Sequence, residues 1–218
     1  IRDRYNAIKI GKKIVSSNFI EKLKCDGCKT CSLVCPVEDA IVFHENTAGE
    51  WFVSQTKFGK IVHAELFPAQ DNSGKLVTKV RKEAEEIAEN EKSDLLLIDG
   101  PPGVGCPVHA SVTNIALCVI VTEPTQSGLA NCEMVLELAE HFQFKCLIII
   151  NKCDISNEVA TLIRRKLTEK NAEIIAEIPF DNNWSKQIAE GKSILSKVSP
   201  ATKTEIVNGW QKIKTYLT

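Results

Sequence analysis

The first feature that could support chemistry is a run of four cysteines near the start of the chain. The run has the spacing C-x2-C-x2-C-x3-C, and Pro36 follows its last thiol. Thiolates spaced this closely can hold the corners of a cubic iron–sulfur cluster. Gly27, inside the run, allows backbone geometry that other residues resist. The spacing predicts a 4Fe-4S cluster with the ligands Cys25, Cys28, Cys31 and Cys35.

Zinc is the alternative metal for such a set. Zinc sites usually consist of two C-x2-C pairs with a longer loop between them, whereas all four cysteines here lie in one compressed run. The pattern therefore favours iron over zinc.

A second cluster is a further hypothesis. Residues 6–8 (N-A-I) and 39–41 (D-A-I) each precede a short strand-like stretch, as two copies of one structural half would. Asp3 lies where the fourth cysteine of the first copy is expected. Either Asp3 ligates iron, more weakly than a thiolate, or this half has lost its cluster. The number of clusters, one or two, stays open.

The bulk composition is that of a globular protein. Net charge is −1 and no basic patch is evident, so nucleic acid is not an expected partner. The apolar runs are too short to cross a bilayer, and the start of the chain has no leader pattern. Nine cysteines then indicate metal or redox use in a reducing compartment, and we expect a cytoplasmic protein.

The second part of the sequence alternates helix and strand patterns. Short apolar runs at 95–99, 116–122, 146–151 and 173–179 are separated by helical stretches that include 129–142 and 158–170. This alternation predicts an α/β fold with a mostly parallel sheet and helices on both faces. Ligands of such folds bind beyond the carboxyl ends of the strands.

Polar residues follow these predicted strands in an informative order. Asp99 ends the run L-L-L-I-D, where a carboxylate can hold Mg2+. Gly103 lies in the next loop, where its N–H could meet a γ-phosphate. Asn151, at a later strand end, has an amide able to read a base edge. Pro179, Phe180 and Asp181 follow the last strand. Each signal is weak alone, but the order predicts a nucleotide site.

One required part of such a site is absent from the sequence. A phosphate-binding loop needs G-x-x-x-x-G-K-[ST], and the G-K-S at 191–193 has Lys186 where the first glycine belongs. The chain begins Ile1-Arg2, and Met134 is its only methionine. We expect a preceding segment that carries the first strand, the phosphate loop and the first cysteine run.

Together these stretches resemble the MinD/ParA-like P-loop ATPases that contain an inserted ferredoxin domain and are related to the nitrogenase iron protein. The resemblance rests on the cysteine run, L-I-D-G-P-P-G-V-G-C-P-V, V-T-E-P-T-Q-S-G-L, I-N-K-C-D and I-P-F-D. It implies a P-loop NTPase core of the SIMIBI type. It also implies Asp99 as the Walker B acid, Gly103 in switch II, an adenine contact from Asn151, and Pro179 and Asp181 near the base and ribose.

The resemblance also implies a domain plan and a function. Residues 1–56 would be the ferredoxin-like α+β insert, and residues 57–218 the ATPase core without its first strand. A dimer with itself or with a related ATPase would hydrolyse ATP with Mg2+, coupled to electron transfer or iron–sulfur cofactor handling through a redox or metal-cofactor partner. Asn131 departs from the aspartate that relatives often have there.

Two other functions compete with the ATPase hypothesis. The chain could be a non-catalytic electron-transfer module on an NTPase-like scaffold. It could also position itself on membranes as MinD does, because Ile206, Trp210, Ile213 and Leu217 lie on one face of a predicted helix. We favour packing of that face on the sheet, since an apolar stripe of this kind usually faces a core.

Overall fold

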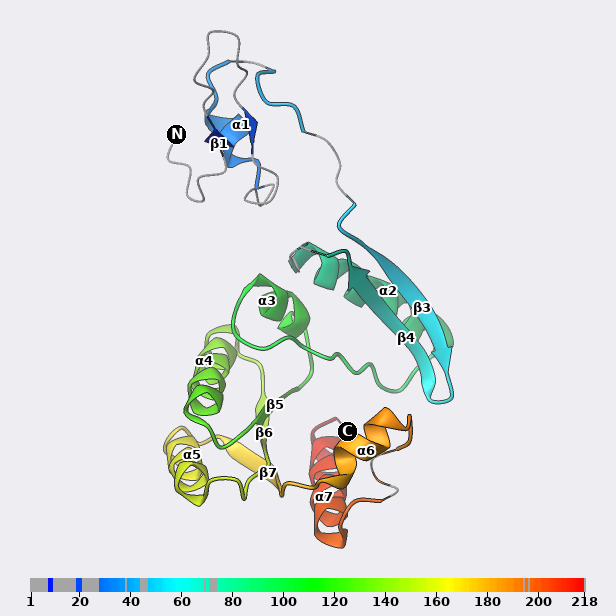
Figure 1. Cartoon of the computed structure of the whole chain (residues 1–218), viewed down its shortest axis with the longest axis vertical. Coiled ribbons are helices and arrows are strands. Elements are labelled where there is room, and N and C mark those ends of the chain that lie inside the picture. Colours follow the sequence, from blue (N-terminus) through cyan, green and yellow to red (C-terminus); the bar gives the residue numbers. More distant parts are fainter. Residues whose placement is uncertain are drawn as a thin grey trace. The chain divides into compact units, whose positions relative to one another are not determined.

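The computed structural model describes residues 8–9, 19–20, 28–37, 39–43, 47–68, 70, 74–193, 195 and 197–217. The chain divides into two compact units, Ile1–Asp71 and Asn72–Thr218 (Figure 1). The boundary expected after residue 56 falls at the turn of a hairpin that lies entirely within the first unit. The division therefore comes after Asp71, since a boundary at residue 56 would separate two hydrogen-bonded strands.

The first unit contains short elements and one long hairpin. Strand β1 pairs antiparallel with β2, and β3 pairs antiparallel with β4 over eight residues each. Thr56 pairs with Gly59 across the hairpin turn. Gly59 has φ 133°, a backbone conformation that glycine adopts readily and that residues with a side chain rarely adopt. The described elements are β1 (Ile8–Lys9), β2 (Phe19–Ile20), α1 (Thr30–Val34), β3 (Gly49–Thr56) and β4 (Gly59–Leu66).

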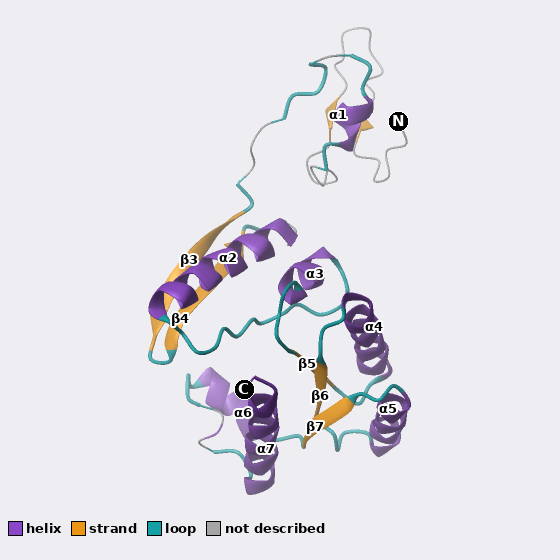
Figure 2. Cartoon of the chain, turned by 180° about the vertical axis from the view of Figure 1, so that it is seen from behind, coloured by secondary structure: helices purple, strands orange, loops and turns teal. Residues whose placement is uncertain are grey.

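The second unit is a layered α/β structure, and Figure 2 shows its helices and strands from the opposite side. Its elements are α2 (Gly74–Glu91), α3 (Cys106–Val112), β5 (Cys118–Thr122), α4 (Gln126–Phe142), β6 (Cys146–Asn151), α5 (Asn157–Glu169), β7 (Glu173–Ile178), α6 (Asn183–Ala189) and α7 (Pro200–Leu217).

Strands β5, β6 and β7 form a parallel sheet in the order β5-β6-β7. The order follows from two successive strand–helix–strand units, in which α4 and α5 return the chain to the start of the next strand. Three of the four predicted strands are thus confirmed, with the parallel arrangement that the alternation of apolar runs and helical stretches indicated.

One face of this sheet packs against α4 and α5. Ile120, Ile148 and Ile150 form a cluster with buried side chains of the two helices, among them Ile163 and Leu167. Burying one such side chain is worth about 1.5–3 kcal/mol, so this cluster supplies much of the force that holds the three strands together.

The other face is covered by α7 (Figure 1). Gly209 brings the helix so close to β7 that a Cβ added there would lie 3.0 Å from the Cβ of Ala176. Thr202 and Gly209 are the buried residues of α7, while Trp210 is exposed. Helices therefore lie on both faces of the sheet. The side of α7 that packs is the one with Thr202 and Gly209, whereas Trp210 and Leu217, from the apolar stripe that we expected to pack, are exposed. No helix in the described ranges is long and apolar enough to cross a membrane.

The predicted strand at residues 95–99 is wrong. Residues 95–100 have no regular secondary structure, and the side chains of Leu95, Leu96 and Leu97 are exposed, Leu97 by 84%. A strand requires a hydrogen-bonded neighbour, and no strand in the described part of the chain pairs with this segment. Apolar character alone did not make this run a strand.

Candidate functional site

The carboxyl ends of β6 and β7 lie side by side. Asn151, the last residue of β6, pairs in register with Ile178, the last residue of β7. The N–H of Cys153 donates to the carbonyl of Ile178 at 3.0 Å, which extends the pairing into the loops. The sheet thus places the turn after Asn151 beside the segment that begins at Pro179.

The side chain of Asn151 lies at the start of a tight turn. Its Oδ1 accepts the N–H of Lys152 at 3.1 Å, and Lys152 has φ 52°. Lys152 in turn forms a 2.7 Å ion pair with Glu123, which follows β5. This ion pair links the loops after β5 and β6, although both side chains are too exposed for it to add much stability.

Asp181 ties together two segments that are far apart in sequence. One carboxylate oxygen accepts the N–H of Asn183 at 2.9 Å and the other accepts the N–H of Ser199 at 2.8 Å. These backbone donors, Ser199 first and then Asn183, lower the pKa of Asp181. Asp181 is therefore held ionised, and it joins the start of α6 to the start of α7.

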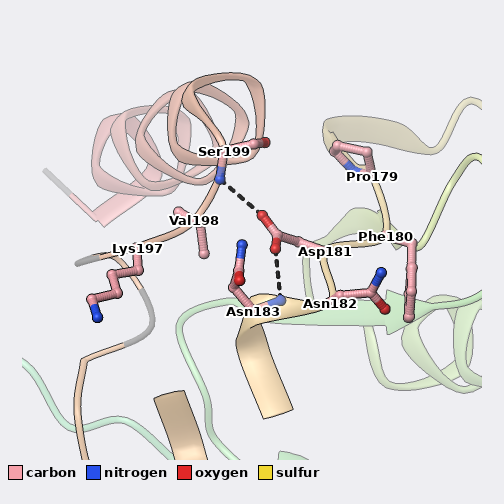
Figure 3. A pocket seen from close by; sticks show the side chains of 8 residues that line it. All are labelled: Pro179, Phe180, Asp181, Asn182, Asn183, Lys197, Val198 and Ser199. Atoms are coloured by element: carbon pink, nitrogen blue, oxygen red, sulfur yellow. Dashed lines mark hydrogen bonds between the residues drawn. The ribbon is translucent and has the colours of Figure 1, made fainter. Parts of the chain in front are cut away.

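A cavity of about 570 Å³ opens at this point (Figure 3). The N–H of Phe180 donates to Asp154 at 2.7 Å, which fixes the segment after β7 against the turn after β6. The Phe180 ring is half exposed at the cavity wall. The lining residues are Pro179, Phe180, Asp181, Asn182, Asn183, Lys197, Val198 and Ser199.

The structure gathers part of the predicted site and leaves part of it separate. Pro179, Phe180 and Asp181 share the cavity, whereas Asn151, Asp99 and Gly103 are not among its lining residues. Asp99 is exposed, in the irregular segment before α3. Gly103 has φ 90°, and an added Cβ would meet nothing within 4 Å, so backbone conformation and not space favours glycine here.

The cysteine run is described only in part. Cys25 and Asp3 lie outside the described residues, as do several other segments of the expected ferredoxin-like insert. The Cys28 thiol contacts the Thr30 hydroxyl at 3.4 Å, and the Cys35 thiol lies 3.5 Å from the carbonyl of Val37. Across the described ranges, no three His, Cys, Asp or Glu side chains lie close enough together to hold a metal ion.

Sequence reasoning missed four residues that shape the site. Ser199 precedes Pro200 at the start of α7, a typical pattern at a helix start, and its Oγ accepts the N–H of Thr202 at 3.2 Å. Asp154 could have been noticed in N-K-C-D. No sequence signal could have paired Glu123 with Lys152, because the pair depends on how the strands are aligned.

The chain is similar in structure to solved MinD proteins. MinD cell division protein from Aquifex aeolicus matches with a TM-score of 0.55 and 21% identity, over 75% of this chain and 68% of that one. Cell division ATPase MinD from Pyrococcus furiosus matches with a TM-score of 0.57 and 18% identity, over 75% and 69%. The chain has a MinD-like fold. The MinD of a MinC:MinD cell division protein complex from Aquifex aeolicus matches equally well, with a TM-score of 0.55 and 22% identity, over 75% and 66%.

The sequence relatives of this MinD-like chain have names that state no function. No protein-family profile matches the chain. Two proteins of Methanocaldococcus jannaschii, uncharacterized proteins MJ0578 and MJ0579, are 29% and 25% identical over 157 and 150 residues. These matches cover 72% and 69% of the chain and 51% of each relative. The chain therefore spans about half the length of the curated relatives it matches.

Proposed function

We propose that this chain is part of a MinD-like ATPase that binds ATP with Mg2+ at the carboxyl edge of its sheet. The observation that carries the proposal is the cavity after β7, which lies where ligands of parallel α/β sheets bind. The matched Pyrococcus furiosus protein is a cell division ATPase. The buried hydroxyl of Thr122, at the end of β5, has no hydrogen-bond partner among the described residues, as expected of a group that faces an added ligand or water.

Each predicted residue has a role in this proposal. Asp99 would hold Mg2+ through water, and its exposed carboxylate, which makes no ion pair within the described ranges, suits that role. The bound ion would neutralise charge on the phosphates. The N–H of Gly103 would meet the γ-phosphate, and Asn151 with Pro179 and Phe180 would contact the base. Each oxygen of Asp181 already accepts one backbone N–H, which fixes the carboxylate at the cavity wall, and the remaining lone pairs could accept a ribose hydroxyl.

The phosphate cradle must come from elsewhere, because the 218 residues contain no G-x-x-x-x-G-K-[ST]. We place it in a further segment of the natural protein, consistent with relatives of about twice the matched length. A strand from that segment would give the exposed run at 95–97 a neighbour, which it lacks in the described part of the chain. The active form would be a dimer, with itself or with a related ATPase.

The cysteine run supports a second, separate proposal. Four thiols with this spacing are the donor set that a 4Fe-4S cluster takes, and Cys25, Cys28, Cys31 and Cys35 would hold it. The support is the spacing alone, since the described thiols do not form a metal-binding group. Iron and acid-labile sulfide measured after anaerobic purification test it, and equal loss of both in Cys28→Ala is the expected result.

The test of the ATPase proposal uses the natural full-length protein and two aspartates that flank the same apolar run. Asp94 and Asp99 are both exposed, on either side of residues 95–98. Asp99→Asn should lower Mg2+-dependent ATP hydrolysis roughly 100-fold or more, since metal stabilisation is worth several kcal/mol. Asp94→Asn should leave the rate unchanged. Equal rates in the two variants would refute the role of Asp99, and absence of adenine nucleotide binding by the wild type would refute the function.

A further inference from the structure

Two cysteines that the sequence places in separate apolar runs meet in the folded protein. Cys118 begins β5 and Cys146 begins β6, and the two are direct partners in the parallel register. The N–H of Cys118 donates to the carbonyl of Lys145 at 2.9 Å, which holds the two strand starts together. The two side chains are close enough for each to shift the pKa of the other.

The distance between these residues suits a covalent link. Neighbouring strands lie about 4.7–4.9 Å apart, and disulfides form across Cα separations of about 4.4–6.8 Å. Both side chains lie on the sheet face that packs against α4, and both are partly exposed. Cys132, on α4, is only 1% exposed, so an oxidant in solution reaches Cys118 and Cys146 first.

The two thiols are not equivalent. The neighbouring Cys146 side chain lowers the pKa of Cys118, although burial opposes this shift. The neighbouring Cys118 side chain and burial both raise the pKa of Cys146. Cys118 therefore supplies the thiolate that attacks, and Cys146 follows as the second thiol.

We propose that Cys118 and Cys146 are a redox modification site, which a low-molecular-weight disulfide converts into an intramolecular disulfide. The Cys118 thiolate attacks one sulfur of the small disulfide and expels the other as a thiolate. The sulfur of Cys146 then gives up its proton and attacks the Cys118 sulfur, which expels the second small thiol. Two protein thiols are oxidised and one small disulfide is reduced to two thiols.

This link is expected to be reversible. The hydrogen bonds between β5 and β6 fix the spacing of the two residues. The disulfide can therefore form without movement of the backbone. Thiol–disulfide exchange runs in both directions, so an excess of a small thiol reduces the link again. The site needs neither nucleotide nor iron, and it stands whether or not the proposed ATPase function does.

The experiment treats the folded, reduced chain with oxidised glutathione, blocks the remaining thiols in acid, and maps peptides after trypsin and Glu-C digestion. A Cys106→Ser background is used because Cys106 otherwise shares a peptide with Cys118. The expected product joins that peptide to Cys146–Lys152, two hydrogen atoms lighter than the separate peptides. Dithiothreitol should release it.

Matched variants separate this site from general thiol oxidation. Cys118→Ala should abolish the linked peptide, while Cys153→Ala, which removes another partly buried thiol near the same core, should retain it. The oxidised wild type should also unfold at a higher urea concentration than the reduced form. Three results would overturn the proposal. They are glutathione adducts without the link, full recovery of Cys118 and Cys146 as blocked free thiols, and a link that forms only in urea.

Discussion

Replacing Gly128 by alanine tests how tightly α4 begins against the end of β5. An added Cβ would lie 2.3 Å from the carbonyl oxygen of Glu123 and 3.0 Å from the hydroxyl oxygens of Thr122 and Thr125. The Glu123 carbonyl already accepts the N–H of Thr125 at 2.7 Å, so it cannot withdraw freely. The extra methyl group must therefore push backbone apart at this turn.

The expected effect is the difference between two opposing contributions. Alanine is favoured over glycine in a helix by about 1 kcal/mol. Overpacking against backbone costs about 3 kcal/mol, the upper end of the usual range. Gly128→Ala should therefore destabilise the protein by about 2 kcal/mol, which corresponds to a fall in Tm of roughly 4–8 °C for a unit of this size.

Urea denaturation followed by circular dichroism measures this change, together with a matched control. Ser127 is the preceding residue in the same turn and is exposed, so Ser127→Ala should change stability by less than about 0.5 kcal/mol. A Gly128→Ala protein as stable as the wild type, or more stable, would refute the reasoning, because helix propensity would then be the larger contribution.

Three further predictions concern helix ends and close contacts. Thr125→Ala removes the side chain that accepts the Gly128 N–H at 2.9 Å, and should cost about 1 kcal/mol in urea unfolding; no loss would mean that the cap is not formed in solution. Gly209→Val should destabilise by about 1–3 kcal/mol through its contact with Ala176, and Ala176→Gly should recover part of the loss in the double variant; additive losses would contradict the contact. Asp181→Asn should lower stability at neutral pH. Because its folded pKa is lowered, the carboxylate contributes fully above about pH 4 and its contribution disappears as pH falls through the lower folded value. Wild type and variant should therefore converge in acid urea titrations, and a constant difference down to low pH would contradict this origin.

The sequence predicted the three paired strands well because each is a largely apolar run between helical stretches. Such a run predicts burial on both faces, and β6 with its fully buried Leu147, Ile148 and Ile150 shows it. The run at 95–99 has the same character but no neighbour in the described part of the chain. The local sequence pattern predicts the tendency to form a strand, whereas pairing depends on whether a neighbouring strand is present.

The candidate site shows the same limit. Pro179, Phe180 and Asp181, which line the cavity, directly follow β7. Their position in the sequence therefore already places them at the carboxyl edge of the sheet. The roles of Ser199 toward Asp181 and of Cys118 toward Cys146 depend on register and on helix packing between distant segments. Those relations exist only after folding, and spacing in the sequence does not encode them.

The central claim is that nucleotide binds at the carboxyl ends of β5, β6 and β7. Hydrogen–deuterium exchange of the natural full-length protein, with and without Mg2+-ADP, tests it most directly. The account predicts slower exchange of the loop at 99–105 and of the segments at 151–155 and 179–183, with no change at 143–146, which lies at the opposite end of the strands. Unchanged exchange at all three segments under saturating nucleotide, or protection confined to 143–146, would contradict it.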